Sequence, residues 1–179
     1  MWKSKFLLMS VAAVLGSALI GLMLSNSSNA TNPESVVVQV AFVAPISVSA
    51  ETSPLEFGSL DVAMLLNDTV TVNPDGTSAE SAANIVGGTQ DSASLDVIAT
   101  PGRPINILVD NVTAGAHYTL GTWLCDYNAG LANACFTPGW STTSIAGTIV
   151  VRVGATLTGL GTAVAGDFDG SFDLTVAYE

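Results

Sequence analysis

Basic residues are the scarcest feature of this sequence, since four lysines and arginines stand against 15 aspartates and glutamates. Nucleic-acid binding needs clustered basic side chains, so this composition excludes a nucleic-acid partner. The chain also has one histidine, His117, and two cysteines, which excludes metal sites built from several histidines. No nucleophile motif accompanies His117, and a catalytic base acts on a positioned nucleophile. We therefore expect neither enzymatic activity nor a cofactor.

Two of the four basic residues, Lys3 and Lys5, belong to an N-terminal segment with the pattern of a secretory signal peptide. They precede the apolar run Phe6–Leu24, and Ser28-Asn29-Ala30 then supplies the small residues that a signal peptidase recognises. The sequence therefore predicts a signal peptide over residues 1–30 and an exported protein that reaches the cell surface or the exterior through the periplasm. The alternative is an uncleaved membrane anchor, because the apolar run is close to the length of a membrane span.

The two cysteines, Cys125 and Cys135, enclose a short loop rich in asparagine, glycine and alanine. Disulfides persist in proteins outside the cytoplasm, so export allows these two residues to pair. Their spacing is not the Cys-x-x-Cys of redox enzymes, which favours a structural bridge. Closing a loop of about eleven residues should stabilise the fold by about 3 kcal/mol in the loop-entropy description.

Apolar and polar residues alternate with a period of two in several stretches, which is typical of half-buried β-strands. In the clearest stretch, at the end of the chain, Phe172, Leu174, Val176 and Tyr178 share one face. Shorter candidates are Ile46–Ala50, Ser59–Leu65, Thr69–Val72, Ser94–Ala99, Ile105–Asp110 and Thr148–Val153. No stretch after residue 30 has a convincing helical pattern.

Turn signals separate these candidate strands. The strongest is Val72-Asn73-Pro74-Asp75-Gly76-Thr77, which predicts a hairpin because proline presets φ and glycine takes the left-handed corner. Short strands joined by glycine-rich turns predict a single all-β domain over residues 46–179, with the architecture of a β-sandwich.

The segment before this domain, residues 31–45, contains an unusually apolar strand candidate. Val36, Val38, Val40 and Phe42 form a continuous ridge along one of its faces. Burying four such side chains is worth roughly 6–12 kcal/mol before ordering costs, so some surface must cover them. That surface is either the chain's own domain or a groove on a neighbouring copy. Pro45 interrupts ladder pairing, so the strand need not continue into the domain.

Four stretches occur in a recognisable order: Leu55-Glu56-Phe57-Gly58-Ser59-Leu60, the Val72–Thr77 turn, Ala99-Thr100-Pro101-Gly102 and the final Ala165–Glu179. With them the chain resembles, from about residue 46 to its end, the bacterial secreted family known as domain of unknown function 4402. The resemblance implies an architecture more readily than an activity.

The two ends of the chain also resemble subunits of chaperone–usher pili. In those pilins the last strand alternates apolar residues, ends in a penultimate tyrosine and has a glycine fourteen residues from the end. Here Tyr178 is penultimate and Gly166 is fourteenth from the end. This resemblance implies an incomplete immunoglobulin-like fold, to which a periplasmic chaperone and then the next subunit, delivered by an outer-membrane usher, each lend a strand.

On this resemblance the chain is a structural subunit of a pilus or surface fibre, assembled with neighbouring copies of itself by donor-strand exchange. The expected donor ridge comprises Val36, Val38, Val40 and Phe42. The expected acceptor edge, which the chaperone also covers, comprises Gly166, Phe172, Leu174, Val176 and Tyr178.

Other interpretations stay open. Residues 36–43 could fold back into their own domain and give a self-complemented secreted protein that binds surfaces or carbohydrates. Aromatic residues near the cysteine loop, such as Trp123 and Trp140, could then stack on sugars. The acidic stretch Asp167-Phe168-Asp169-Gly170 is similar to part of a calcium loop, but it lacks the terminal glutamate, and we expect no metal site.

Overall fold

The computed structural model describes residues 42–49, 51–166 and 169–179, and the regular structure within them is entirely β. The predicted signal peptide and residues 31–41 lie outside the described residues. The strands are β1 (Ser47–Val48), β2 (Ser59–Leu60), β3 (Thr69–Val72), β4 (Ser78–Glu80), β5 (Ile85–Gly87), β6 (Ala93–Ile98), β7 (Pro104–Thr113), β8 (Tyr118–Tyr127), β9 (Asn133–Ala134), β10 (Trp140–Thr143), β11 (Ile149–Gly159) and β12 (Ser171–Tyr178).

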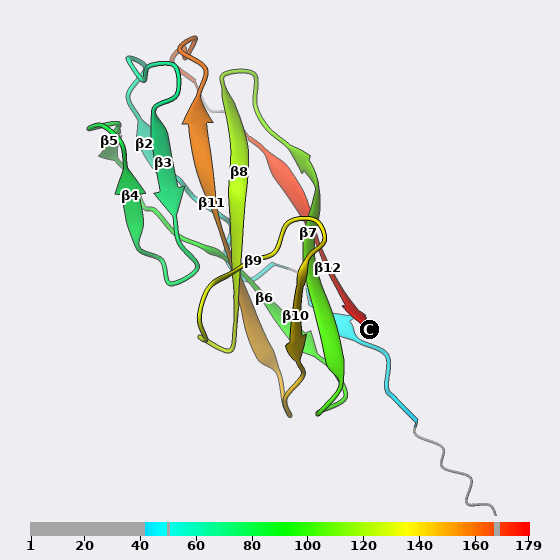
Figure 1. Ribbon diagram of the computed structural model, residues 1–179. Helices are drawn as coiled ribbons and strands as arrows, with labels where there is room; N and C mark the ends of the chain where they lie inside the picture. The colour runs from blue at the N-terminus through cyan, green and yellow to red at the C-terminus, as the bar shows by residue number, and fades with distance from the viewer. Residues whose placement is uncertain (1–41, 50, 167–168) are drawn as a thin grey trace, which may run out of the picture. The chain divides into compact units, whose positions relative to one another are not determined.

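The largest sheet is built around β11, its longest strand (Figure 1). β8 pairs along one side of it, and β9 pairs β8 in turn. On the other side, β6 pairs the first half of β11 and β3 pairs the second half. β1 extends this sheet beyond β6 and β4 extends it beyond β3, and every one of these pairs is antiparallel. One long strand thus pairs directly with three others, each of which carries a further strand.

Gly154 marks the point at which β11 changes partners. A Cβ atom at this position would collide with the backbone oxygen of Val72, so only glycine lets the two strands approach so closely. The register of β11 with β8 also shifts between Gly154 and Thr156. A bulge of this kind increases the local twist, which helps β11 to pair with both β6 and β3 along the same edge.

A second sheet has the order β10-β7-β12, and a two-stranded sheet pairs β2 with β5. β7 is the centre of the second sheet, because β10 pairs its first half and β12 runs along nearly its whole length. The β12 register places Leu174 opposite Val109, Val176 opposite Ile107 and Tyr178 opposite Ile105.

One apolar core joins the two larger sheets. Alternate residues of β7 point into it and are fully buried, as are alternate residues of β11, because strand side chains on one face repeat every second residue. The fully buried members include Val97, Ile105, Ile107, Val109, Val151 and Val153. The prediction of an all-β domain is confirmed, and its antiparallel sheets enclose this shared core.

The predicted hairpin at Val72–Thr77 is confirmed. Asn73 N donates to Thr77 O (2.8 Å) and Gly76 N donates to Asn73 O (2.9 Å), and Gly76 takes a φ of 80°. The prediction of a strand over Ser59–Leu65 is wrong beyond Leu60. Residues 61–68 instead form turns, because the Asp61 side chain accepts from Ala63 N (2.9 Å) and so competes with strand pairing.

The sequence analysis missed β8 although it is one of the longest strands. Its alternation changes phase in the middle: Leu120 packs toward the core, and farther along Trp123 and Cys125 do so. Thr122, between them, has a φ of 47°, which interrupts the extended backbone. A period-two search fails across such a shift.

Candidate functional site: a groove along the last strand

The free edge of β12 forms one wall of the candidate site. β12 pairs only with β7, and within the described part of the chain no strand pairs its other edge. Its apolar face, Phe172, Leu174, Val176 and Tyr178, is half-buried, whereas the β7 residues opposite the last three are fully buried. The apolar face of β12 therefore stays partly exposed to solvent on the side away from β7.

The opposite wall is the chain between β1 and β2. β1 pairs the end of β6 at Ser47↔Ile98, and the segment continues along β6 at Ser53↔Ser94 and past its start at Glu56↔Asp91, all antiparallel. Two of its apolar residues, Leu55 and Phe57, are half-buried against the core. We call the space between this segment and β12 the edge groove.

The floor of the edge groove is apolar. It includes Leu95 from β6, Leu120 from β8 and Leu157 from β11. Phe172, on the β12 wall, also contacts the core, because its ring lies 4.9 Å from that of Trp123 with a tilt of 50°. Aromatic pairs favour such tilted packing, which holds Phe172 in the wall of the groove.

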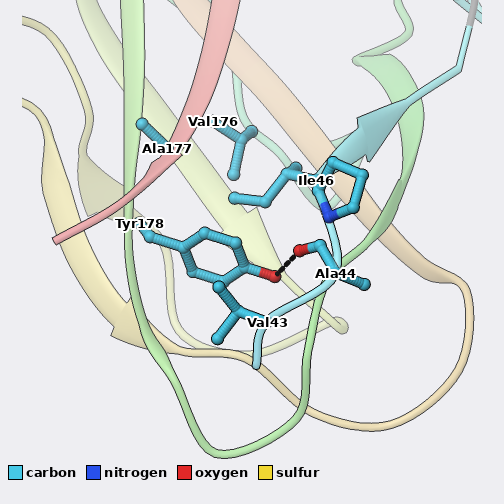
Figure 2. Close-up of a pocket in the computed structure, with 7 residues that line it drawn as sticks. Val43, Ala44, Ile46, Val176, Ala177 and Tyr178 are labelled. Carbon is cyan, nitrogen blue, oxygen red and sulfur yellow. Dashed lines mark hydrogen bonds between the residues drawn. The ribbon is translucent and has the colours of Figure 1, made fainter. Parts of the chain in front are cut away.

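At the end of β12, hydrogen bonds join this strand to the chain before β1 and to the chain after β6, and Figure 2 shows the bond between Tyr178 and Ala44. The Tyr178 hydroxyl donates to Ala44 O (2.9 Å) and accepts from Thr100 N (2.7 Å). Ala44 N donates in turn to Thr100 Oγ1 (2.8 Å). We call this three-residue arrangement the Tyr178 clasp. Beside it, Val43, Ile46 and the residues from Val176 to Tyr178 line a shallow apolar depression.

At the other end the groove opens among loops. Gly166 lies there, with a φ of 152°, together with Val62 and Val164. The structure thus places all five predicted acceptor-edge residues along the groove or in the apolar depression beside the Tyr178 clasp. Of the predicted donor ridge, Val36, Val38 and Val40 lie outside the described residues, and Phe42 is 91% exposed.

Sequence reasoning missed the second wall and the clasp. Leu55 and Phe57 alternate around Glu56, which is a strand signal, but the segment is too short to stand out. Nothing in the sequence indicates that Thr100 and Ala44 meet the last strand, because they are 78 and 134 residues from Tyr178.

The predicted disulfide is confirmed. Cys125 and Cys135 are bonded, with their Cα atoms 5.7 Å apart, and both are fully buried. The bridge joins β8 to the residue after β9 and closes the loop between them. Disulfides of this kind persist outside the reducing cytoplasm, which indicates a non-cytoplasmic protein.

Three aromatic residues near the disulfide, Trp123, Tyr127 and Trp140, are largely covered by the domain itself. Trp123 and Tyr127 are buried, with 3% and 7% of their surface exposed, and Trp140 is half-buried against the core. Among the described residues, no cluster of three or more histidine, cysteine, aspartate or glutamate side chains could hold a metal ion. A helix long and apolar enough to cross a membrane is likewise not found in the described ranges.

Asp126 is a buried carboxylate on β8. Its Oδ2 lies 3.4 Å from Nη1 of Arg152, its register partner on β11, while its Oδ1 has no hydrogen-bond partner. Burial raises the pKa of Asp126 above its ordinary value, and the Arg152 charge offsets only part of that effect. This group affects stability and does not line the edge groove.

Comparison with known proteins identifies a family but no characterised relative. No curated protein and no solved structure matches the chain. A family described as a domain of unknown function, DUF4402, matches residues 46–178, which include both walls of the edge groove, the disulfide and β12. The resemblance to this family is thereby confirmed, and the chain belongs to the DUF4402 family.

Proposed function

We propose that this protein is a structural subunit of an extracellular pilus or surface fibre, in which the N-terminal extension of one copy fills the edge groove of the next. The domain is then an immunoglobulin-like β-sandwich that lacks one strand. The observation that carries the proposal is the half-open apolar face of β12 beside the fully buried Ile105, Ile107 and Val109 of β7. Strand addition fits such an edge, because backbone hydrogen bonds supply affinity and alternate side chains supply register.

The extension matches the groove in length and period. β12 has eight residues, and so has the segment from Val36 to Val43. Eight residues of β-strand span roughly 25 Å. The ridge Val36, Val38, Val40 and Phe42 repeats every second residue, as does the face of β12 that it would join. A chain with this ridge can therefore cover the groove along its full length.

The described start of the extension favours donation to another copy. Phe42, the last member of the ridge, is 91% exposed and does not occupy the groove of its own domain. The Tyr178 clasp fixes Ala44 just after it. An open edge and an open apolar groove invite aggregation, so a periplasmic chaperone would cover them until an outer-membrane usher joins the copies.

A pair of adjacent valines provides the test. Val38 belongs to the ridge and Val37 to the opposite face, so Val38→Asp should abolish oligomers of the exported chain, whereas Val37→Asp should leave most of them. Size-exclusion chromatography and electron microscopy report the assembly. The Val38→Asp chain keeps its groove and should bind a fluorescent peptide of residues 31–44, measured by anisotropy.

A different result would contradict the proposal. If the unchanged chain is a homogeneous monomer, binds no such peptide and protects its extension from proteases, the protein completes itself. The alternative, a self-complemented secreted binding module, would then replace the fibre subunit.

A further inference from the structure

We infer that the two ends of the domain form a second interface between copies, in which exposed apolar loops of one copy pack on the extension root of the next. This inference rests on the proposed function. The loop end comprises Val62, Leu65, Leu66, Leu160 and Val164. The root end comprises Val43, Pro101, Gly102, Arg103 and Ile145.

The strands define these two ends. β12 begins opposite Thr113, beside the loops that follow β7 and β11, and it ends opposite Ile105. The Tyr178 clasp places Ala44 at this second end, and Figure 1 shows the cyan start of the described chain near the C-terminus. The extension therefore leaves the domain at the end toward which β12 runs.

This geometry decides the direction of a donated strand. A donor parallel to β12 would bring its own root against the root end of the acceptor, so two copies would exchange extensions and close as a pair. A donor antiparallel to β12 has its Phe42 end beside Ser171, and its domain lies beyond the loop end of the acceptor. Only this antiparallel arrangement leaves a free extension for growth, because head-to-tail contacts are the ones that extend.

The connection between the groove and the next domain is short. In the antiparallel arrangement Phe42 fills the last position of the acceptor's groove, and Ala44 is already held in the donor's own clasp. Only Val43 lies between them, so two Cα–Cα steps of about 3.8 Å each separate the two copies. The root end of one copy must consequently touch the loop end of the next.

The loop end exposes an unusual number of apolar side chains. Leu65 is 68% exposed, Leu66 is 62% exposed, and Val62 and Val164 are each 54% exposed. Val62 and Val164 also line the edge groove, so this surface continues from the groove mouth. Contiguous exposed apolar residues beside a binding groove are typical of a docking surface.

Hydrogen bonds hold the two leucines in this position. Asn67 N donates to Gly159 O (3.0 Å), Gly159 N donates to Asp68 O (2.9 Å), and Asp68 N donates to Leu65 O (3.2 Å). The Asp68 carboxylate also accepts from Leu65 N (2.9 Å). The loop is thus fixed to the end of β11, and Leu65 and Leu66 cannot turn inward without breaking these bonds.

The root end complements this surface. Val43 is 47% exposed and Ile145 is 38% exposed, which supplies apolar area. From residue 31 onward the chain has 15 acids and two arginines, and Arg152 is paired with Asp126. The other arginine, Arg103, lies at the root end, whereas the loop end carries Asp61 and Asp68. Glu179 also lies at the root end, because its backbone N donates to Pro104 O (3.2 Å), so apolar area rather than net charge makes the two ends complementary.

The double variant Leu65→Gln/Leu66→Gln tests this interface. Because both side chains are exposed, the domain should fold normally. Leu131→Gln, an 88% exposed leucine in the cysteine loop, is the matched control. In the Val38→Asp background, binding of the 31–44 peptide should change less than twofold for either variant. In the chain with the natural extension, the concentration for half-assembly should rise at least tenfold for the double variant alone.

Each outcome has one meaning. If the double variant assembles at the same concentration as the unchanged chain, the end-to-end interface is refuted while the proposed function stands. If closed pairs form in place of longer oligomers of the unchanged chain, the antiparallel direction is wrong and the interface with it. If the unchanged groove binds no peptide, the proposed function itself fails and the inference with it.

Discussion

β7 and β12 are neighbours in one sheet, yet one is sealed and the other is half-open. Their inward side chains face each other in register, Ile107 beside Val176 and Ile105 beside Tyr178. β7 has a strand on each side and its inward residues are fully buried, whereas β12 has a strand on one side only. The difference shows that the alternation of a strand sets the direction of its side chains, and that its neighbours set how deeply they are buried.

The largest expected effect comes from truncating this pair. Ile107→Ala should destabilise the domain by about 2–5 kcal/mol, because it leaves a cavity in a sealed core. Val176→Ala should cost only about 1 kcal/mol, since half of its burial is missing. Chemical denaturation of both variants in the Val38→Asp background measures the two losses.

The donor peptide sharpens this comparison. If a strand completes the groove, a saturating amount of the 31–44 peptide should increase the cost of Val176→Ala and leave the cost of Ile107→Ala nearly unchanged. Equal costs for the two substitutions without peptide would show that β12 is already sealed, contrary to the half-open face described above.

The disulfide should give the second effect. It closes a loop at the far side of the core, where β8 and β9 are already paired, so its contribution comes largely from restricting the unfolded chain. Cys125→Ala/Cys135→Ala should lower the free energy of unfolding by about 3 kcal/mol. Peptide binding at the edge groove should stay unchanged once the variant is folded. A loss of groove binding in folded protein would contradict the independence of the two regions.

The single variant Cys125→Ala serves as the control, because it also removes the bridge but keeps Cys135. A larger loss in the double variant than in the single one would measure the packing of the second sulfur.

The Tyr178 clasp should contribute less. Tyr178→Phe removes two hydrogen bonds and keeps the ring, so about 1–2 kcal/mol should be lost. Hydrogen exchange at Ala44 N should also speed up, because the Ala44 carbonyl loses its hydrogen bond to the Tyr178 hydroxyl. Tyr127→Phe is the matched control, since that hydroxyl accepts one longer bond from Ile145 N (3.3 Å). Equal exchange rates at Ala44 in both variants would refute the clasp.

Local sequence signals predicted a good part of this structure. The hairpin at residues 72–77 follows from its proline and glycine, β12 follows from strict alternation, and Cys125 had only one possible partner. The hairpin and β12 depend on residues that are close in the sequence, and the disulfide depends only on the number of cysteines. The shared face of Phe172, Leu174, Val176 and Tyr178 could be predicted for the same reason, because these residues belong to one strand, whereas their role as an acceptor edge stays a prediction.

Other features depend on contacts that the sequence does not encode locally. β8 was missed because its inward face changes at Thr122, and such a shift is set by pairing with β11. The second wall of the groove and the Thr100–Ala44 contact join segments far apart in the chain. Only the fold brings those segments together, so no periodicity could reveal them.

The smallest expected effect concerns pH and compares Asp126 with Asp75. Burial raises the pKa of Asp126 in the folded protein, so the folded state holds this proton more tightly than the unfolded state. Its contribution to stability is therefore present at low pH and is lost as the pH rises through the raised pKa. Hydrogen bonds from Thr77 lower the pKa of Asp75, whose contribution is present above its ordinary pKa and is lost as the pH falls.

Asn substitutions should consequently change the pH profile of unfolding in opposite ways. The unchanged protein should lose stability as the pH rises above about 4, and Asp126→Asn should remove this loss. Asp75→Asn should instead remove a decline toward acid pH. Urea denaturation between acid and neutral pH measures both profiles. If Asp126→Asn destabilises the protein more at neutral pH than at acid pH, the attraction to Arg152 outweighs the cost of burying the Asp126 carboxylate.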